Sequence, residues 1–148
     1  MGGGKTGELI MARVRIVKNN IPEVLNEVEK QKHKILEMIG SKAEGYVKAL
    51  TPVDTGLLRN SITYAVGGES PSISEYSDNS GEVKGTYSGT EGKKGDGCVY
   101  IGTNVEYATY VEFGENKKHT TGKAHFLRDG IQNNMDEFKK IIEEELKK

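Results

Sequence analysis

Apolar residues recur every three or four positions between residues 21 and 50, the spacing that places them on one face of an α-helix. Asn20 and Pro22 suit its first turn, and Pro52 ends it near Leu50, because proline has no amide to donate. At 1.5 Å per residue the helix would be about 40 Å long, so part of it could serve a neighbouring subunit. The predicted stripe consists of Ile21, Leu25, Val28, Ile35, Ile39, Ala43, Tyr46 and Leu50, with Lys32 as its one polar position.

Three other residues of this predicted helix carry separate expectations. Gly40 and Gly45 lower the stability of a helix relative to alanine, so we expect another element to cross the helix closely there. His33 lies on the opposite, charged face without a second ligand at helical spacing. We interpret it as a surface histidine.

A second amphipathic pattern predicts a helix over residues 126–146, and alternating polar and apolar positions predict strands. The strands are an edge strand at 11–17, a strand at 62–66 and a strand at 98–102. The expected fold is therefore α+β, with a small antiparallel sheet packed against two long amphipathic helices. The apolar residues of the second helix are Phe126, Leu127, Ile131, Met135, Phe138, Ile142 and Leu146.

Short helices are predicted after two turns. Asp54 is placed to cap a helix that follows the Pro-Val-Asp-Thr-Gly turn, where Gly56 allows backbone to approach backbone. Asn104 is placed to cap a helix over residues 105–113, which stops at Gly114. We expect the aromatic cluster on that helix to face the core, with phenolic ends able to reach a subunit boundary. The cluster consists of Tyr107, Tyr110, Val111 and Phe113.

Residues 67–97 form a polar insert with eight glycines. Weak strand patterns at 73–76 and 83–87 predict a long hairpin projecting from the sheet. The composition leaves open whether it folds only against a partner or is simply disordered. Its acidic residues outnumber its lysines, so it is poorly suited to line a channel that holds DNA.

Composition and charge exclude several classes of protein. The chain has 148 residues and a net charge of -1, so no global electrostatic attraction draws it to nucleic acid or to an anionic membrane. Cys98 is its one cysteine, which excludes a disulfide framework and a cysteine-rich zinc site, and no apolar run reaches the length of a membrane span. We expect a flexible leader at residues 1–10 and one domain at residues 11–148, with the insert inside it.

Three segments, in this order and spacing, resemble the signature of a family of small tail-completion or head-to-tail joining proteins of long-tailed bacteriophages. They are residues 51–62 (Thr-Pro-Val-Asp-Thr-Gly-Leu-Leu-Arg-Asn-Ser-Ile), residues 99–114 (Val-Tyr-Ile-Gly-Thr-Asn-Val-Glu-Tyr-Ala-Thr-Tyr-Val-Glu-Phe-Gly) and residues 125–128 (His-Phe-Leu-Arg). The family was first described as tail components of lambda-like phages. The resemblance runs from about residue 21 to the C-terminus, apart from the insert. This chain departs from it at His125, where proline is frequent, and at Asp129 and Gly130, where the family often has Pro-Ala.

The resemblance implies a structural virion protein without catalytic, cofactor-binding or metal-binding residues. It would act in the neck as one subunit of a ring, and reside in the host cytoplasm during assembly. Its partners would be other copies of itself, the tail terminator or tail tube protein, and head-side connector proteins. The resemblance implies no contact with a membrane. A position in the neck is compatible with passive contact with DNA in the channel. The positions that match the motifs or support them are Pro52, Asp54, Thr55, Gly56, Leu58, Arg59, Gly102, Tyr107, Ala108, Tyr110, Glu112, Phe113, Gly114, Phe126, Leu127 and Arg128.

Two alternatives and two hypotheses accompany this interpretation. A tail terminator that caps the tail tube is the nearest alternative, and a small hydrolase or a nucleic-acid-binding module is more distant. We expect Arg59 to pair with Glu112 in the same or the next subunit, because each motif ends in one charged residue beside apolar anchors. We also expect the hairpin of the insert to contact the tail tube or a ring of different symmetry.

Overall fold

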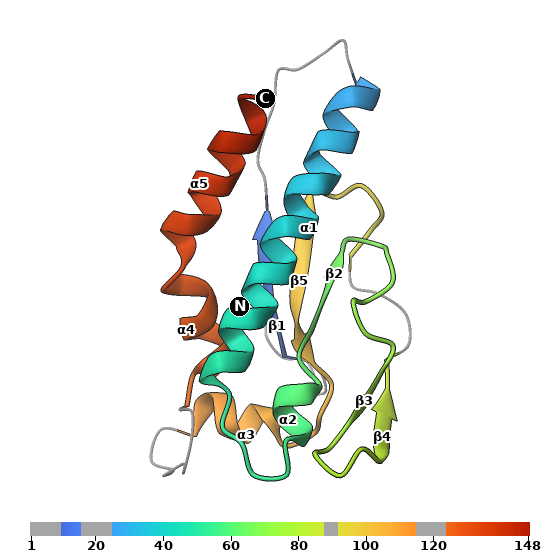
Figure 1. The fold of residues 1–148 in the computed structure, drawn as a ribbon, viewed down its shortest axis with the longest axis vertical. Coiled ribbons are helices and arrows are strands. Elements are labelled where there is room, and N and C mark those ends of the chain that lie inside the picture. Colours follow the sequence, from blue (N-terminus) through green and yellow to red (C-terminus); the bar gives the residue numbers. More distant parts are fainter. Residues whose placement is uncertain (1–9, 16–24, 88–91, 115–123) are drawn as a thin grey trace.

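The structure is a computed structural model, and it describes residues 10–15, 25–87, 92–114 and 124–148. It is a mixture of helices and short antiparallel sheets, so the predicted α+β class is confirmed (Figure 1). The proposed leader lies outside the described residues, and the division into domains stays a prediction. The elements are β1 (Ile10–Arg15), α1 (Leu25–Leu50), α2 (Leu57–Asn60), β2 (Thr63–Val66), β3 (Glu75–Ser77), β4 (Val83–Thr86), β5 (Cys98–Thr103), α3 (Ala108–Phe113), α4 (Phe126–Gln132) and α5 (Met135–Leu146).

The main sheet has three antiparallel strands in the order β1-β5-β2. The strand β1 lies at one edge, as its alternating pattern predicts, and β5 lies in the centre. The predicted end of the edge strand, at residues 16–17, lies outside the described residues. Val99 and Ile101 of β5 have no exposed surface, because a central strand is covered by its neighbours and by the helix that packs on it. The strands predicted at 62–66 and 98–102 are confirmed to within a residue at each end.

The long helix α1 crosses one face of this sheet, with α4 and α5 beside it (Figure 1). It ends at Leu50, as Pro52 predicts, and the buried Thr51 donates a hydrogen bond of 2.7 Å to the carbonyl of Val47. The predicted stripe is confirmed at its centre, although Leu36 and Val47 are buried without belonging to it. The predicted start at residues 20–22 lies outside the described residues. The fully buried apolar positions of α1 are Ile35, Leu36, Ile39, Ala43 and Val47.

The two glycines of α1 have different surroundings. A β-carbon at Gly40 would lie 2.3 Å from the ring of Tyr64, so the expected close crossing is confirmed there and comes from β2. Nothing lies within 4 Å of the corresponding position at Gly45. The expectation of a crossing at Gly45 is therefore wrong, because that position faces open space.

The pattern over residues 126–146 forms two helices, where one continuous helix was expected (Figure 1). The helix α4 ends at Gln132 and α5 begins at Met135. Between them Asn134 adopts φ −119° and its side-chain amide donates a 2.9 Å hydrogen bond to the carbonyl of Gly130. The side chain of Asn134 thereby takes the acceptor that a continuing helix offers to a backbone amide, which breaks the helix. The apolar periodicity continues across the break and so gives no sign of it.

The insert forms the predicted hairpin, with β3 paired antiparallel to β4, but it does not project freely from the sheet. Tyr76 is buried, and its ring lies 5.3 Å from that of Tyr87. Both tyrosines and Ile73 pack against the main core. The described part of the insert is therefore a hairpin docked on the rest of the domain, because its few apolar residues pack against the core of its own chain.

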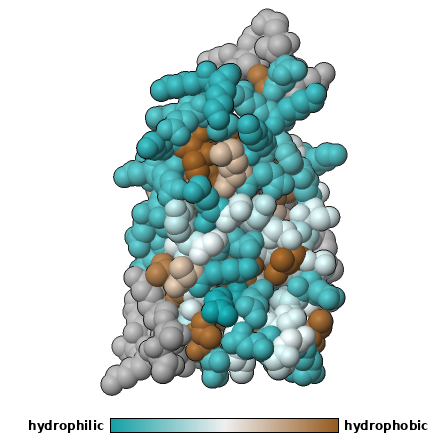
Figure 2. Space-filling model, viewed as in Figure 1, coloured by the Kyte–Doolittle hydropathy of each residue, from teal (hydrophilic) through white to brown (hydrophobic). Residues whose placement is uncertain are grey.

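Polar side chains cover most of the face seen in Figure 2, and apolar residues appear there as small separate patches. No helix among the described residues combines the length and the apolar character needed to cross a bilayer. Larger apolar side chains gather on the surface at the end of the molecule opposite the C-terminus, around α3 and β4.

Candidate assembly surface

The turn after α1 positions the short helix α2 through its backbone. Gly56 precedes the helix with φ +83°, a left-handed conformation that residues with a β-carbon rarely adopt. A β-carbon there would also lie 2.1 Å from the side chain of Asn79. The need for glycine is confirmed by the positive φ, and the expected approach of backbone to backbone is confirmed by the amide of Asn79, which donates a 2.7 Å hydrogen bond to the carbonyl of Thr55. The expected capping by Asp54 is wrong. Asp54 is exposed, the residue directly before α2 is Gly56, which has no side chain, and the hydroxyl of Thr55 accepts the amide of Leu57 at 3.3 Å.

The first two motif segments meet through buried polar groups. The hydroxyls of Ser61 and Thr103 lie 2.5 Å apart, and neither residue exposes more than 1% of its surface. Burial raises the pKa of Tyr107, a backbone hydrogen bond of Leu58 opposes the rise, and the nearby Asp54 carboxylate adds to it. Residues 51–62 and 99–114 therefore form one scaffold, although they are far apart in the sequence.

The predicted cap of the helix over residues 105–113 is also wrong. The helix α3 begins at Ala108, and no side chain caps it. Asn104 instead donates a 3.2 Å hydrogen bond to the carbonyl of Thr86 in β4. The hydroxyl of Thr103 accepts the amide of Val105 at 3.1 Å. Asn104 is used for a long-range contact with the hairpin, which its position before a helical pattern does not reveal.

The buried carboxylate of Glu112 joins α3 to the first turn of α4. Its two oxygens accept the backbone amides of Leu127 at 2.8 Å and Arg128 at 3.1 Å, and its carbonyl accepts the amide of His125 at 3.0 Å. These amides are free at the start of any helix, and the negative charge suits that end of the helix dipole. His125 precedes the helix with φ +60° and provides no side-chain cap. Proline cannot adopt this φ, so the departure from the family at this position fits the local backbone.

The expected pair between Arg59 and Glu112 is wrong within the chain. Glu112 is 3% exposed and is engaged by the start of α4, whereas Arg59 lies 3.5 Å from the side-chain oxygen of Asn79. A carboxylate with both oxygens occupied and almost no exposed surface is also poorly placed to meet an arginine of another subunit. Glu112 holds two motifs together through backbone amides fifteen residues away, and no local spacing in the sequence signals that role.

Of the cluster predicted to face the core, Val111 packs against it, but the three aromatic residues do not, contrary to prediction. Tyr107 is 43% exposed, Tyr110 is 69% exposed and Phe113 is 64% exposed, whereas Ala108 and Glu112 on the same helix are buried. Ala108 and Glu112 point toward the interior. Ala108 is small enough for close packing, and Glu112 caps α4. The three aromatic residues consequently face outward. We call Tyr107, Tyr110 and Phe113 together the α3 surface.

The residues singled out in the sequence thus divide by burial. The buried ones hold the scaffold in place, and they are Gly56, Leu58, Gly102, Ala108, Glu112, Phe126 and Leu127. Pro52, Arg59 and Gly114 are partly exposed, and the exposed ones are Asp54, Thr55, Tyr107, Tyr110, Phe113 and Arg128. The three motif segments gather at one end of the molecule, around α2, α3 and the start of α4 (Figure 1).

One comparison with known proteins identifies the family of this chain. A family model described as "Bacteriophage HK97-gp10, putative tail-component" matches residues 17–114, about two thirds of the sequence. The chain belongs to the HK97 gp10-like family. The HK97 gp10-like match covers the first two motif segments and the insert between them, and ends before residues 125–128. Membership makes the protein a phage tail component, and hence a component of the virion.

The other two comparisons add no relative. Neither curated proteins nor solved structures gave a match to the chain. The assignment to the HK97 gp10-like family therefore depends on the family model and on the motif segments that the structure brings together.

Proposed function

We propose that this tail component acts in the neck of the virion, as one subunit of a ring that completes the tail and joins it to the head. The observation that carries the proposal is the α3 surface: Tyr110 and Phe113 expose most of their side chains on a helix fixed from behind by Ala108 and Glu112, and the partly exposed Tyr107 lies just before that helix. Exposed aromatic residues on a rigid element are typical of the central contacts of protein interfaces. No catalytic step is part of the proposal.

The occupant of the α3 surface in this proposal is a second copy of the chain. A ring of identical subunits needs two different complementary surfaces on each subunit, because each copy contacts the next in a head-to-tail manner. Val83 on β4 is 49% exposed. The hairpin β3-β4 and α3 lie at the same end of the molecule, on opposite sides of it (Figure 1). We infer that the α3 surface of one subunit packs against the hairpin of its neighbour. The hairpin then contributes to the ring, instead of reaching only toward the tail tube.

The test replaces Tyr110 and Phe113 together by serine. Both side chains are exposed, so the free energy of unfolding should change by less than about 0.5 kcal/mol per site. In contrast, tails assembled without this protein should no longer be joined to heads when the variant is added, as counted by infectious particles and by electron microscopy. Leu146→Ser is the matched control, since Leu146 is also an exposed apolar residue but lies at the end of α5. Wild-type joining by the Y110S/F113S variant would overturn the role of the α3 surface.

Tail length separates the proposal from its nearest alternative. A tail terminator stops the growth of the tube, so tails made without it should be overlong. A completion protein acts on a finished tail, so tails made without it should have normal length and fail only to join heads. Overlong tails in the absence of this protein would favour the terminator.

A further inference from the structure

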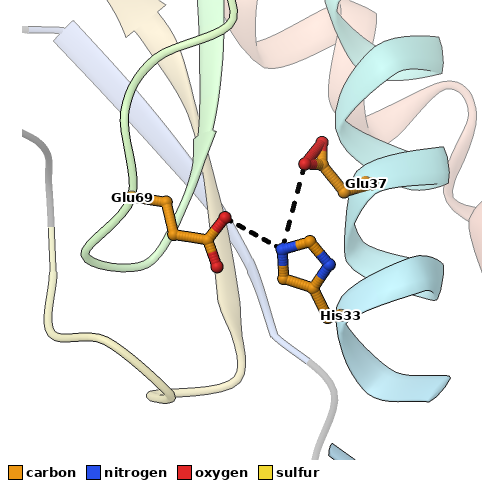
Figure 3. Close-up of side chains that lie close together, drawn as sticks. All are labelled: His33, Glu37 and Glu69. Atoms are coloured by element: carbon orange, nitrogen blue, oxygen red, sulfur yellow. Dashed lines mark hydrogen bonds and ion pairs between the residues drawn. The ribbon is translucent and has the colours of Figure 1, made fainter. Parts of the chain in front are cut away.

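A cluster of metal-ligating side chains lies on the other half of the molecule, away from the α3 surface. His33 and Glu37 project from the same face of α1, one turn apart, and Glu69 faces them from the loop after β2 (Figure 3). His33 is exposed, which confirms its interpretation as a surface histidine, but the expected lack of a second ligand at helical spacing is wrong, because Glu37 stands four residues away and the fold adds Glu69. We propose that His33, Glu37 and Glu69 bind one divalent transition-metal ion of the zinc class, which clamps α1 to this loop.

The separations within the cluster fit such an ion. Nε2 of His33 lies 2.9 Å from Oε1 of Glu69 and 3.9 Å from Oε2 of Glu37, and the three candidate donor atoms all lie within 4.8 Å of one another. In a tetrahedral zinc site with bonds of about 2.1 Å, the donor atoms are about 3.4 Å apart. The two distances from the imidazole lie on either side of that value. Side-chain rotations alone would bring the three donors to it.

The surroundings leave room for a bound ion and its water ligands. A hollow of about 170 Å³ opens beside His33 and Glu69, which is enough for water molecules to complete the coordination. Lys32 and Lys94 also line this hollow, but Lys32 is paired with Glu29 at 3.2 Å. Asp96 lines it too and is not counted as a ligand, because its oxygens accept the amide of Cys98 and the hydroxyl of Tyr100, both at 2.9 Å.

Two further contacts orient the carboxylates. The half-buried phenol of Tyr64 hydrogen-bonds the carboxylate of Glu37. Glu69 lies in a tight turn, in which its amide bonds the carbonyl of Val66 at 2.8 Å and Gly68 adopts φ +77°. Outer contacts of this kind fix ligands before the ion arrives and strengthen metal binding.

One nitrogen and two carboxylate ligands favour zinc over the hard cations. Imidazole is a good ligand for zinc and its neighbours in the first transition row, whereas calcium prefers six to eight oxygen ligands and magnesium keeps much of its water. The proposal therefore predicts that zinc binds and that calcium and magnesium do not compete with it at equal concentration. It concerns the stability of the chain and does not depend on the proposed function in the neck.

The test measures zinc binding to the full chain, produced without a histidine tag and treated with a chelator. Titration calorimetry should show one equivalent of zinc bound at micromolar concentration, and the melting temperature followed by circular dichroism should rise when zinc is added. Circular dichroism suits this chain because it contains no tryptophan for fluorescence. His33→Gln should weaken binding by at least about tenfold and remove the rise, and Glu69→Gln should do the same.

Glu75→Gln is the matched control, because Glu75 is an exposed glutamate on β3 outside the cluster. This variant should bind zinc like the wild type. The proposal is overturned if the wild-type chain binds no zinc at millimolar concentration. It is equally overturned if H33Q and E69Q bind zinc as the wild type does, which would place the bound ion elsewhere, or if calcium displaces zinc at equal concentration.

Discussion

Replacing Glu112 by alanine is expected to lower the free energy of unfolding by about 2–4 kcal/mol, a large part of the stability of a small domain. The carboxylate accepts the amides of Leu127 at 2.8 Å and Arg128 at 3.1 Å, and it is 3% exposed. Alanine would leave these amides without their acceptor at the start of α4, in a place that water can hardly reach. Hydrogen bonds to a charged acceptor are stronger than neutral ones, which places the expected loss above that of an ordinary cap.

Chemical denaturation followed by circular dichroism would measure this loss. Glu112→Gln keeps one carbonyl acceptor and the size of the side chain, so it should lose less than E112A. Glu106→Ala is the matched control, because Glu106 is an exposed glutamate just before α3. A loss for E112A no greater than that for E106A would show that the start of α4 does not depend on this carboxylate.

Gly130→Ala is expected to destabilise the protein by a net amount of at least about 1 kcal/mol, although alanine is the better helix former. A β-carbon at Gly130 would lie 2.8 Å from the α-carbon of Val47 and 2.7 Å from its Cγ2. Because the first of these atoms belongs to the backbone, a change of rotamer cannot relieve the contact. The helices α4 and α1 would have to separate at the point where they cross.

Two companion variants make this prediction specific. Gly45→Ala lies in the interior of α1, with nothing within 4 Å of the new β-carbon, and should stabilise the chain by about 0.5–1 kcal/mol. Adding Val47→Ala to G130A removes the contact with Cγ2 but keeps the contact with the backbone, so it should not restore stability. Thermal melts that place G130A above the wild type would show that the helices adapt to the larger residue.

The sequence by itself determined the features that depend on neighbouring residues. Pro52 ends α1 at Leu50 because of its own ring, and alternation predicts β2 and β5 because side chains of a strand point to opposite faces. The turn at Gly56 and the hairpin of the insert were also predicted from the sequence, since turn residues act locally. The motif segments predicted the family, because their order and spacing can be recognised in the sequence without knowing which residues are in contact.

Only the tertiary structure decided how polar and aromatic side chains are used. Glu112 caps α4 from fifteen residues away, and Asn134 breaks a helix whose apolar periodicity continues. The aromatic residues around Tyr110 face outward although their spacing suits a core, and Glu69 reaches His33 across a gap of thirty-six residues. Hydrophobic burial depends on pattern and can be read along the chain. A hydrogen bond or a ligand set instead depends on the positions of a few atoms, which the chain fixes only after it has folded.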